Sequence, residues 1–157
     1  MVVKTMFSPD TGLFANRILW SSALAWAIAQ TLKVFTCMWS EGKPDWSKIL
    51  GPGGMPSSHS AFVTSIAMGV GMQEGWNSAL FAITTGFALV VMYDAAGIRR
   101  AAGEQAQVLN QLIERAFRDG RLEATKMREL LGHTPFEVAM GALLGIAVSW
   151  LMVRRTL

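Results

Sequence analysis

Four apolar blocks separated by short polar junctions dominate the sequence. They cover Ile18–Trp39, Ala61–Gln73, Ser78–Ala96 and Phe136–Val153. A helix needs about 20 predominantly apolar residues to cross the hydrocarbon core of a bilayer. Three blocks come close to that length, and the second does so when its helix begins near Ser57. The pattern therefore predicts an all-α polytopic membrane bundle with about four main spanning helices.

A polar stretch, residues 97–132, separates the third block from the fourth. Apolar residues recur in it at the spacings of three and four that are typical of an amphipathic helix, at Ala102, Ala106, Leu109, Ile113 and Ala116. Asp119-Gly120 breaks this pattern, and Leu122–Leu131 predicts a second short helix. We expect an amphipathic helical insert that covers the protein. Nothing indicates a second domain, so residues 1–157 are expected to form one membrane-embedded domain.

The composition favours insertion into a bilayer. Of the 157 residues, 52% are hydrophobic and 16% are charged, whereas soluble domains carry about 25% charged residues. Cys37 is the only cysteine, which excludes an intrachain disulfide and a cysteine-based zinc cluster. The N-terminal segment lacks the succession typical of a cleavable signal peptide, so we expect the first block to be retained. The sequence indicates an integral protein of a bacterial inner membrane or its equivalent.

Unusual polar residues are predicted to gather at one face of the bundle. Because consecutive spans alternate in direction, the ends of the first and third blocks and the starts of the second and fourth share that face. It carries Lys33, His59, Asp94, Arg99, Arg100, His133 and Glu137. The two histidines are the only ones in the chain, and both occur in polar junctions at helix starts. This face is the candidate site.

The junction Gly53-Gly54-Met55-Pro56-Ser57-Ser58-His59 has two interpretations. A serine before a helix is an ordinary N-cap and needs no further function. Alternatively, glycines that permit close approach and the N–H groups of a helix start form a phosphate cradle without a metal. In that case Ser57 and Ser58 donate to phosphate oxygens, and Gly53, Gly54 and Pro56 support the loop.

The junction before the fourth block predicts a capping box. Thr134 is the N-cap, Pro135 is at N1, and Glu137 at N3 reaches back to the cap. The two roles of Glu137 are compatible, because its carboxylate can also reach His133 and orient the imidazole ring. An imidazole held by a carboxylate is an activated nucleophile.

The remaining charges on this face also have two interpretations. Lys33, Arg99 and Arg100 are either membrane-edge anchors or ligands of an anion. Asp94 is an acidic group in an otherwise apolar span, which is costly in hydrocarbon and requires a partner. Arg99 or Arg100 is the nearest candidate in the sequence.

Four segments match a known pattern over nearly the whole chain: Gln30–Lys33, Gly53–Ser60, Asp94–Ala106 and Leu131–Val138. Together they resemble the divergent type 2 phosphatidic acid phosphatase family, a relative of acid phosphatases and vanadium haloperoxidases. The wider superfamily has a lysine, then Pro-Ser-Gly-His, then an arginine, and finally a histidine with an aspartate four residues beyond it. The corresponding positions are Lys33, Pro56 to His59, Arg99 or Arg100, His133 and Glu137.

The resemblance implies an integral membrane lipid phosphatase that works in two steps. His133 attacks phosphorus to give a phosphohistidine, with Glu137 fixing its tautomer, and water then hydrolyses the intermediate. His59 protonates the leaving oxygen and later activates the water. Lys33, an arginine and the amides of the helix start stabilise the phosphoryl oxygens. No metal and no other cofactor is expected.

Three features depart from the superfamily pattern. Serine replaces glycine at Ser58, glutamate replaces aspartate at Glu137, and more than thirty residues separate Arg99 from His133. The insert between these last two residues is expected to cover or reshape the site. It also leaves open which of Arg99 and Arg100 contacts phosphate.

The distribution of basic residues predicts a cytoplasmic active face. Ten of the fourteen Lys and Arg residues lie on that side: Lys33, Lys43, Lys48, Arg99, Arg100, Arg115, Arg118, Arg121, Lys126 and Arg128. By the positive-inside rule this side faces the cytoplasm. A cytoplasmic site favours a phospholipid precursor such as phosphatidylglycerophosphate, or phosphatidate, whereas an exterior site favours a polyprenyl diphosphate. Membrane lipids and this amphiphilic substrate are the expected partners, nucleic acid is not, and a homo-oligomer stays open.

Two other classes of function are compatible with the same residues. The first is a catalytically silent membrane protein that binds lipid phosphates, or a partner, through the basic cradle. The second is a zinc hydrolase that uses both histidines with Asp94 or Glu137. Phosphate release that persists with a chelator and is inhibited by vanadate would distinguish the phosphatase from the zinc enzyme.

Overall fold

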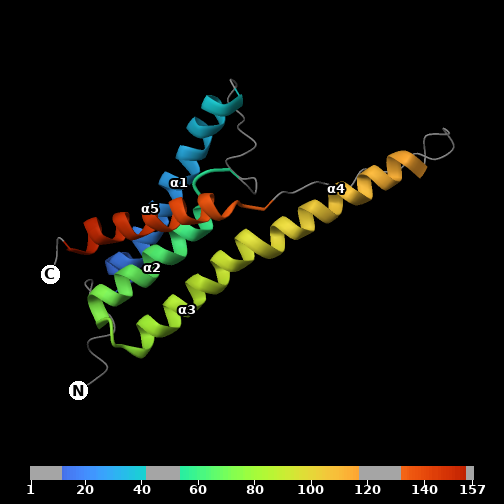
Figure 1. Cartoon of the computed structure of the whole chain (residues 1–157). Coiled ribbons are helices and arrows are strands. Elements are labelled where there is room, and N and C mark those ends of the chain that lie inside the picture. Colours follow the sequence, from blue (N-terminus) through green and yellow to red (C-terminus); the bar gives the residue numbers. More distant parts are fainter. Residues whose placement is uncertain (1–11, 42–53, 117–131, 155–157) are drawn as a thin grey trace, which may run out of the picture.

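Helices dominate the part of the chain that the structure, a computed structural model, describes: residues 12–41, 54–116 and 132–154. In chain order they are η3 (Leu13–Ala15), α1 (Arg17–Glu41), α2 (Ser58–Glu74), α3 (Ala79–Tyr93), η5 (Asp94–Ile98), α4 (Arg99–Ala116) and α5 (Pro135–Arg154). No strand occurs within these ranges. The predicted all-α class is confirmed, and Figure 1 shows the arrangement of the helices.

Among the described residues, three helical segments are long and apolar enough to cross a membrane. They are Arg17–Met38, Ala79–Ile113 and Pro135–Arg154. The fourth predicted span, α2, has 17 residues and begins at Ser58, so its first turn includes the polar Ser-His-Ser sequence as expected. Ten of its residues are buried, among them Ser58 and Ser60, because α2 packs against α1, α3 and α5. The two serines of this polar start are therefore shielded from lipid by protein, whereas His59 between them is exposed.

The turn between α2 and α3 forms as its residue types predict. Gly75 ends α2 with φ of 91°, a conformation that glycine adopts without a steric cost. Ser78 then caps α3, because its Oγ accepts a hydrogen bond from the N–H of Phe81 at 3.2 Å. Trp76 packs edge-to-face on Phe81, with ring centroids 5.2 Å apart. The turn directs α3 back along α2 (Figure 1).

Helices α2 and α5 make the most extensive contact in the bundle. Two glycines of α5 permit the close approach: a Cβ added to Gly141 would overlap the carbonyl oxygen of Ser57, and one on Gly145 would overlap that of Ala61. The hydroxyl of Thr64 donates to the carbonyl of Ala142 at 3.1 Å and adds a polar link across the contact. Small residues at helix crossings have this role in lipid, where no hydrophobic driving force holds helices together.

The third span and the insert form one continuous helix, which corrects the predicted boundary at Ala96. After α3 the chain passes through the π-helical turn Asp94–Ile98 directly into α4. The only helix-weakening residue at this boundary is Gly97, and a single glycine costs about 1 kcal/mol without ending a helix. The amphipathic helix itself is present and extends away from the bundle (Figure 1). Predictions for Gly53, Asp119-Gly120 and Leu122–Leu131 lie outside the described residues.

Candidate functional site

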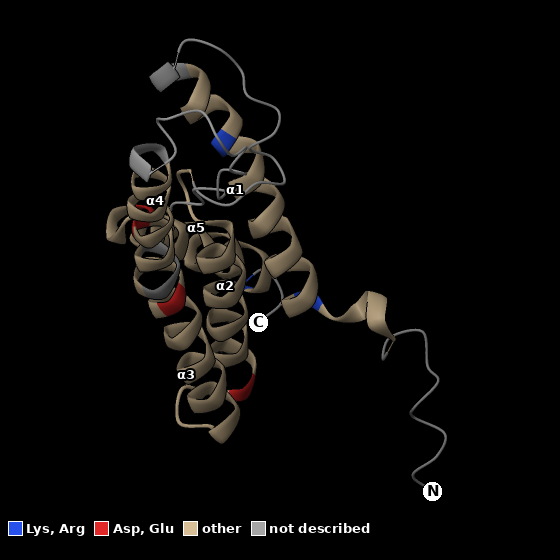
Figure 2. Ribbon diagram, turned by 90° about the vertical axis from the view of Figure 1, so that its right-hand side faces the viewer, with Lys and Arg blue, Asp and Glu red and all other residues tan. Residues whose placement is uncertain are grey.

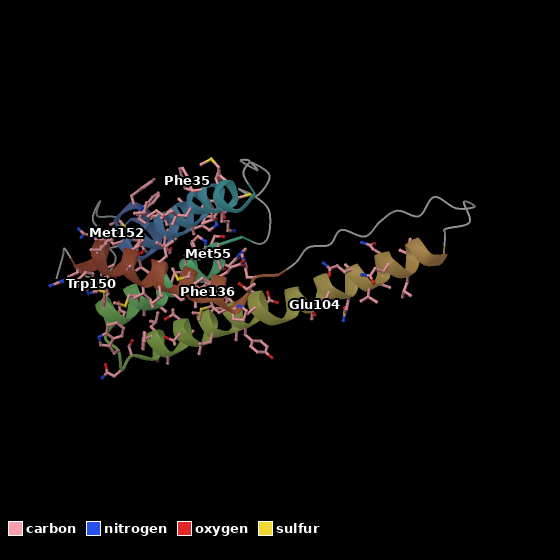
Figure 3. All side chains as sticks on the ribbon, turned by 45° about the horizontal axis from the view of Figure 1, so that its top comes forward. Phe35, Met55, Glu104, Phe136, Trp150 and Met152 are labelled. Atoms are coloured by element: carbon pink, nitrogen blue, oxygen red, sulfur yellow. The ribbon has the colours of Figure 1, made fainter. Side chains whose placement is uncertain are left out.

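The site lies at one end of the bundle, where α1 and α3 end and α2 and α5 begin. Figure 3 shows Met55 and Phe136 at this end. Met55 lies in the loop before α2, and Phe136 lies in the first turn of α5. Trp150 and Met152 lie toward the opposite end (Figure 3). Charged residues are sparse along the bundle helices (Figure 2), so the ionisable groups of this end stand out chemically.

The loop before α2 is fixed against α1. The hydroxyl of Thr36 donates to the carbonyl of Met55 at 2.7 Å. Gly54 has φ of 84°, and a Cβ at this position would contact the Lys33 side chain at 3.7 Å. Pro56 is buried. The loop thus lies close over the aliphatic part of Lys33 and delivers Ser57 and Ser58 to the helix start.

Lys33 is buried within the protein. The residue is 2% exposed, and its Nζ donates a hydrogen bond to the Oγ of Ser58 at 3.3 Å. A membrane-edge anchor would extend its ammonium group to the interface, so this burial favours an internal role for Lys33.

Ser57 caps α2 and is fully buried. Its Oγ accepts hydrogen bonds from the N–H of Ser60 at 3.4 Å and from the hydroxyl of Ser60 at 3.0 Å. Ser57 therefore acts as the N-cap of α2, and its role as a phosphate ligand stays a prediction. Ser58 is the serine that accepts the hydrogen bond from the Lys33 ammonium group.

Glu137 contacts both groups that the sequence suggested for it. Its Oε2 accepts a hydrogen bond from the backbone N–H of Thr134 at 3.1 Å, while the Glu137 N–H donates to Thr134 Oγ1 at 3.3 Å. The same Oε2 lies 3.0 Å from Nδ1 of His133. One carboxylate oxygen thus completes a capping box and orients an imidazole that is 5% exposed.

Two backbone hydrogen bonds join the parts of the site. The N–H of Ser57 donates to the carbonyl of Glu137 at 3.0 Å, which links the start of α2 to the start of α5. The N–H of His133 donates to the carbonyl of Ala95 at 3.1 Å, which links the junction before α5 to the π-helical turn. The Lys33–Ser58 pair and the His133–Glu137 pair therefore belong to one connected unit.

His59 occupies different surroundings from His133. It is exposed and lines a groove of about 440 Å³ together with apolar side chains of α1, α2 and α3: Ala23, Trp26, Phe62, Val63, Phe87 and Val91. The buried imidazole of His133 is adjacent to charged groups, whereas the imidazole of His59 borders hydrocarbon. The two histidines thus have unequal access to water and lipid.

The remaining predicted residues are placed less completely. Asp94 is the first residue of the π-helical turn and is half-buried, a type of turn that is frequent at functional sites. Arg99 and Arg100 are the first two residues of α4. Their side chains lie outside the described part of the chain, so the choice between them as a phosphate ligand stays a prediction.

Sequence reasoning missed two contributors to this unit. Thr36 could have been found, because it is a hydroxyl three residues beyond Lys33 in an apolar block. Ala95 contributes only its carbonyl oxygen, which any residue would supply, so no side-chain signal could have identified it. Among the described residues, no group of three His, Cys, Asp or Glu side chains comes together to hold a metal ion.

Comparison with known proteins places this geometry in context. The model of the family described as the divergent PAP2 family, PAP2 being the type 2 phosphatidic acid phosphatases, matches residues 14–148. A protein of Bacillus subtilis (strain 168) named Uncharacterized membrane protein YuiD is 42% identical over 148 residues. The match covers 87% of this chain and 94% of the Bacillus protein. No solved structure matches the chain significantly.

Proposed function

The chain belongs to the divergent PAP2 family of membrane proteins, and from this premise we propose that it hydrolyses a lipid phosphate monoester or diphosphate through a phosphohistidine on His133. The observation that carries the proposal is the connected unit of Lys33, Ser58, His133 and Glu137. It combines an oriented imidazole, a buried cation and a helix start, which together suit a phosphoryl group.

In the first step His133 is the nucleophile. An ionised Glu137 can only accept hydrogen bonds, so Nδ1 carries the proton and Nε2 carries the lone pair. Nε2 attacks phosphorus while the bond to the lipid oxygen breaks. His59 donates a proton to that oxygen, so the leaving group departs as an alcohol or, from a diphosphate, as a lipid monophosphate.

In the second step water attacks the phosphorus of the phosphohistidine. His59, now neutral, accepts a proton from the water, and the P–N bond breaks to return His133 and release inorganic phosphate. Lys33, Ser58, the first amides of α2 and an arginine of the Arg99–Arg100 pair stabilise the negative charge on the phosphoryl oxygens in both steps. The scheme requires no metal.

The substrate is an amphiphile of the phosphatidylglycerophosphate, phosphatidate or polyprenyl phosphate class. With the site on the cytoplasmic side, as the basic residues predict, a precursor of phospholipid metabolism is the favoured substrate. The alternative function is a catalytically silent protein that holds a lipid phosphate in the same cradle.

Phosphate release from a panel of lipid phosphates, by the protein purified in detergent with a chelator present, tests the proposal. Wild type should release phosphate, and His133→Ala should not. Glu74→Gln, which changes an exposed carboxylate at the end of α2 opposite the site, is the control and should match wild type. If folded wild type releases no phosphate but binds vanadate, the silent binding function replaces the phosphatase.

A further inference from the structure

We propose that the groove beside His59 holds the hydrocarbon chain of the departing lipid, and that Ala23 limits how far the chain extends. The inference rests on the proposed function, because it assigns the leaving group to this side of the site. The groove has a volume of about 440 Å³, which lies within the usual range of ligand sites, about 300–1,000 Å³.

The site passes from charged to apolar in the same order as a lipid phosphate passes from its phosphoryl group to its hydrocarbon chain. Lys33, Ser58 and His133 form a charged and buried region that suits a phosphoryl group. His59 is the proposed donor of a proton to the leaving oxygen, and this imidazole is the polar residue that lines the groove. The atoms that follow this oxygen in a lipid phosphate are hydrocarbon, and beyond His59 the lining is apolar.

The groove has a packed floor and walls that face the bilayer. Val63 is 5% exposed and packs with Ala67 and Ala88 in the core between α2 and α3. Trp26 and Phe87 are 41% and 59% exposed and belong to α1 and α3. Because these helices are apolar enough to span a membrane, a lipid chain can enter the groove sideways without crossing water.

The lining residues extend from the site toward the middle of the membrane. Val63 follows His59 by four residues, or roughly 6 Å along α2, and Ala23 precedes Lys33 by ten residues, or roughly 15 Å along α1. Ala23 is therefore the lining residue of α1 farthest from the charged region. Its side chain is half-buried and small, so a larger side chain there would occupy space for the end of the chain.

Chain-length selectivity tests the groove. Ala23→Leu should shift the profile of kcat/KM against chain length toward shorter chains, by roughly tenfold for the longest substrate. One methylene in a hydrophobic pocket changes kcat/KM by about 10- to 200-fold. We expect the lower end of this range, because the lipid chain moves into the groove from the hydrocarbon of the bilayer and not from water. Ala27→Leu is the control, since Ala27 is exposed one turn further along the same helix and does not line the groove.

Fluorescence of Trp26 gives a readout that does not depend on turnover. A phosphatidate with brominated chains should quench the tryptophan fluorescence of wild type, and vanadate should reverse part of that quenching. In Trp26→Phe, the part of the quenching that vanadate reverses should be absent. This reversible part should weaken in Ala23→Leu and persist in Ala27→Leu.

The outcomes separate the groove from the catalytic proposal. If wild type releases no phosphate, the catalytic proposal fails, and vanadate-reversible quenching at Trp26 still supports the groove as the lipid site. The groove is overturned if Ala23→Leu and Ala27→Leu have the same chain-length profile in an active enzyme. If the protein is inactive, the groove proposal is overturned when vanadate fails to reverse the quenching of Trp26.

Discussion

The contact between Gly141 and Ser57 couples packing to the geometry of the site, and Gly141→Ala should disturb both. The new Cβ overlaps the carbonyl oxygen of Ser57, whose own N–H is bonded to Glu137 O at 3.0 Å. Gly86→Ala is the matched control, because a Cβ on Gly86, also within a spanning helix, meets nothing within 4 Å. Both variants gain the same helix propensity, about 1 kcal/mol, so their difference isolates the overlap.

The expected magnitude follows from the cost of overpacking. Inserting a methyl group into a packed contact costs about 1–3 kcal/mol. At about 2–4 °C per kcal/mol for a chain of this size, Gly141→Ala should unfold roughly 2–12 °C below Gly86→Ala. The two helix starts should also separate, and a displacement of about 1 Å at a catalytic geometry costs about 100-fold in rate.

Thermal unfolding in detergent and phosphate release, measured on both variants, test this reasoning. Gly141→Ala should lose turnover even at temperatures where it remains fully folded, whereas Gly86→Ala should retain it. Equal unfolding temperatures for the two variants would refute the overlap as the reason for glycine at this crossing. A lower unfolding temperature with unchanged turnover would refute the coupling between the crossing and the site.

Three further predictions concern residues around the same unit. Glu137→Gln should keep the capping box, since glutamine also serves at N3, but lose about 10²–10⁴-fold in kcat because His133 Nδ1 loses its carboxylate; equal kcat in wild type and variant would contradict the orienting role. Thr134→Ala should cost about 1 kcal/mol of unfolding free energy with kcat retained, as measured by denaturation and phosphate release. Thr36→Val removes the 2.7 Å bond to Met55 and should cost about 0.5–1.5 kcal/mol, with Thr31→Val, whose exposed hydroxyl bonds only within α1, as the control in the same denaturation assay.

The sequence predicted the helices well because each carries its own local signal. The serines at positions 57 and 78 start α2 and α3, and Gly75 ends α2, as ordinary capping chemistry requires. The predicted end of the third helix at Ala96 was wrong for the complementary reason. A π-helical turn replaces an end there, and nothing in Asp94–Ile98 distinguishes a register change from a continued helix.

The site was predictable only as a set of candidate residues on one face. Topology placed Lys33 beside the start of α2, but it could not show that the ammonium group is buried against Ser58 rather than extended to the interface. It also could not separate the surroundings of the two histidines. That separation depends on which side of α2 faces α5, and two glycines of α5 determine this packing.

The competing interpretations of the two junctions are compatible, because neighbouring groups serve both. Ser57 caps α2 and bonds Glu137 through the backbone, and one oxygen of Glu137 bonds both the Thr134 N–H and His133. The first N–H groups of any helix lack partners within the helix and need other hydrogen-bond acceptors. Because the protein meets this need with a carboxylate beside a histidine, its structural capping also orients the imidazole at no additional cost in buried charge. A helix cap in a membrane protein is thus no argument against a catalytic site when the capping carboxylate also holds a histidine ring.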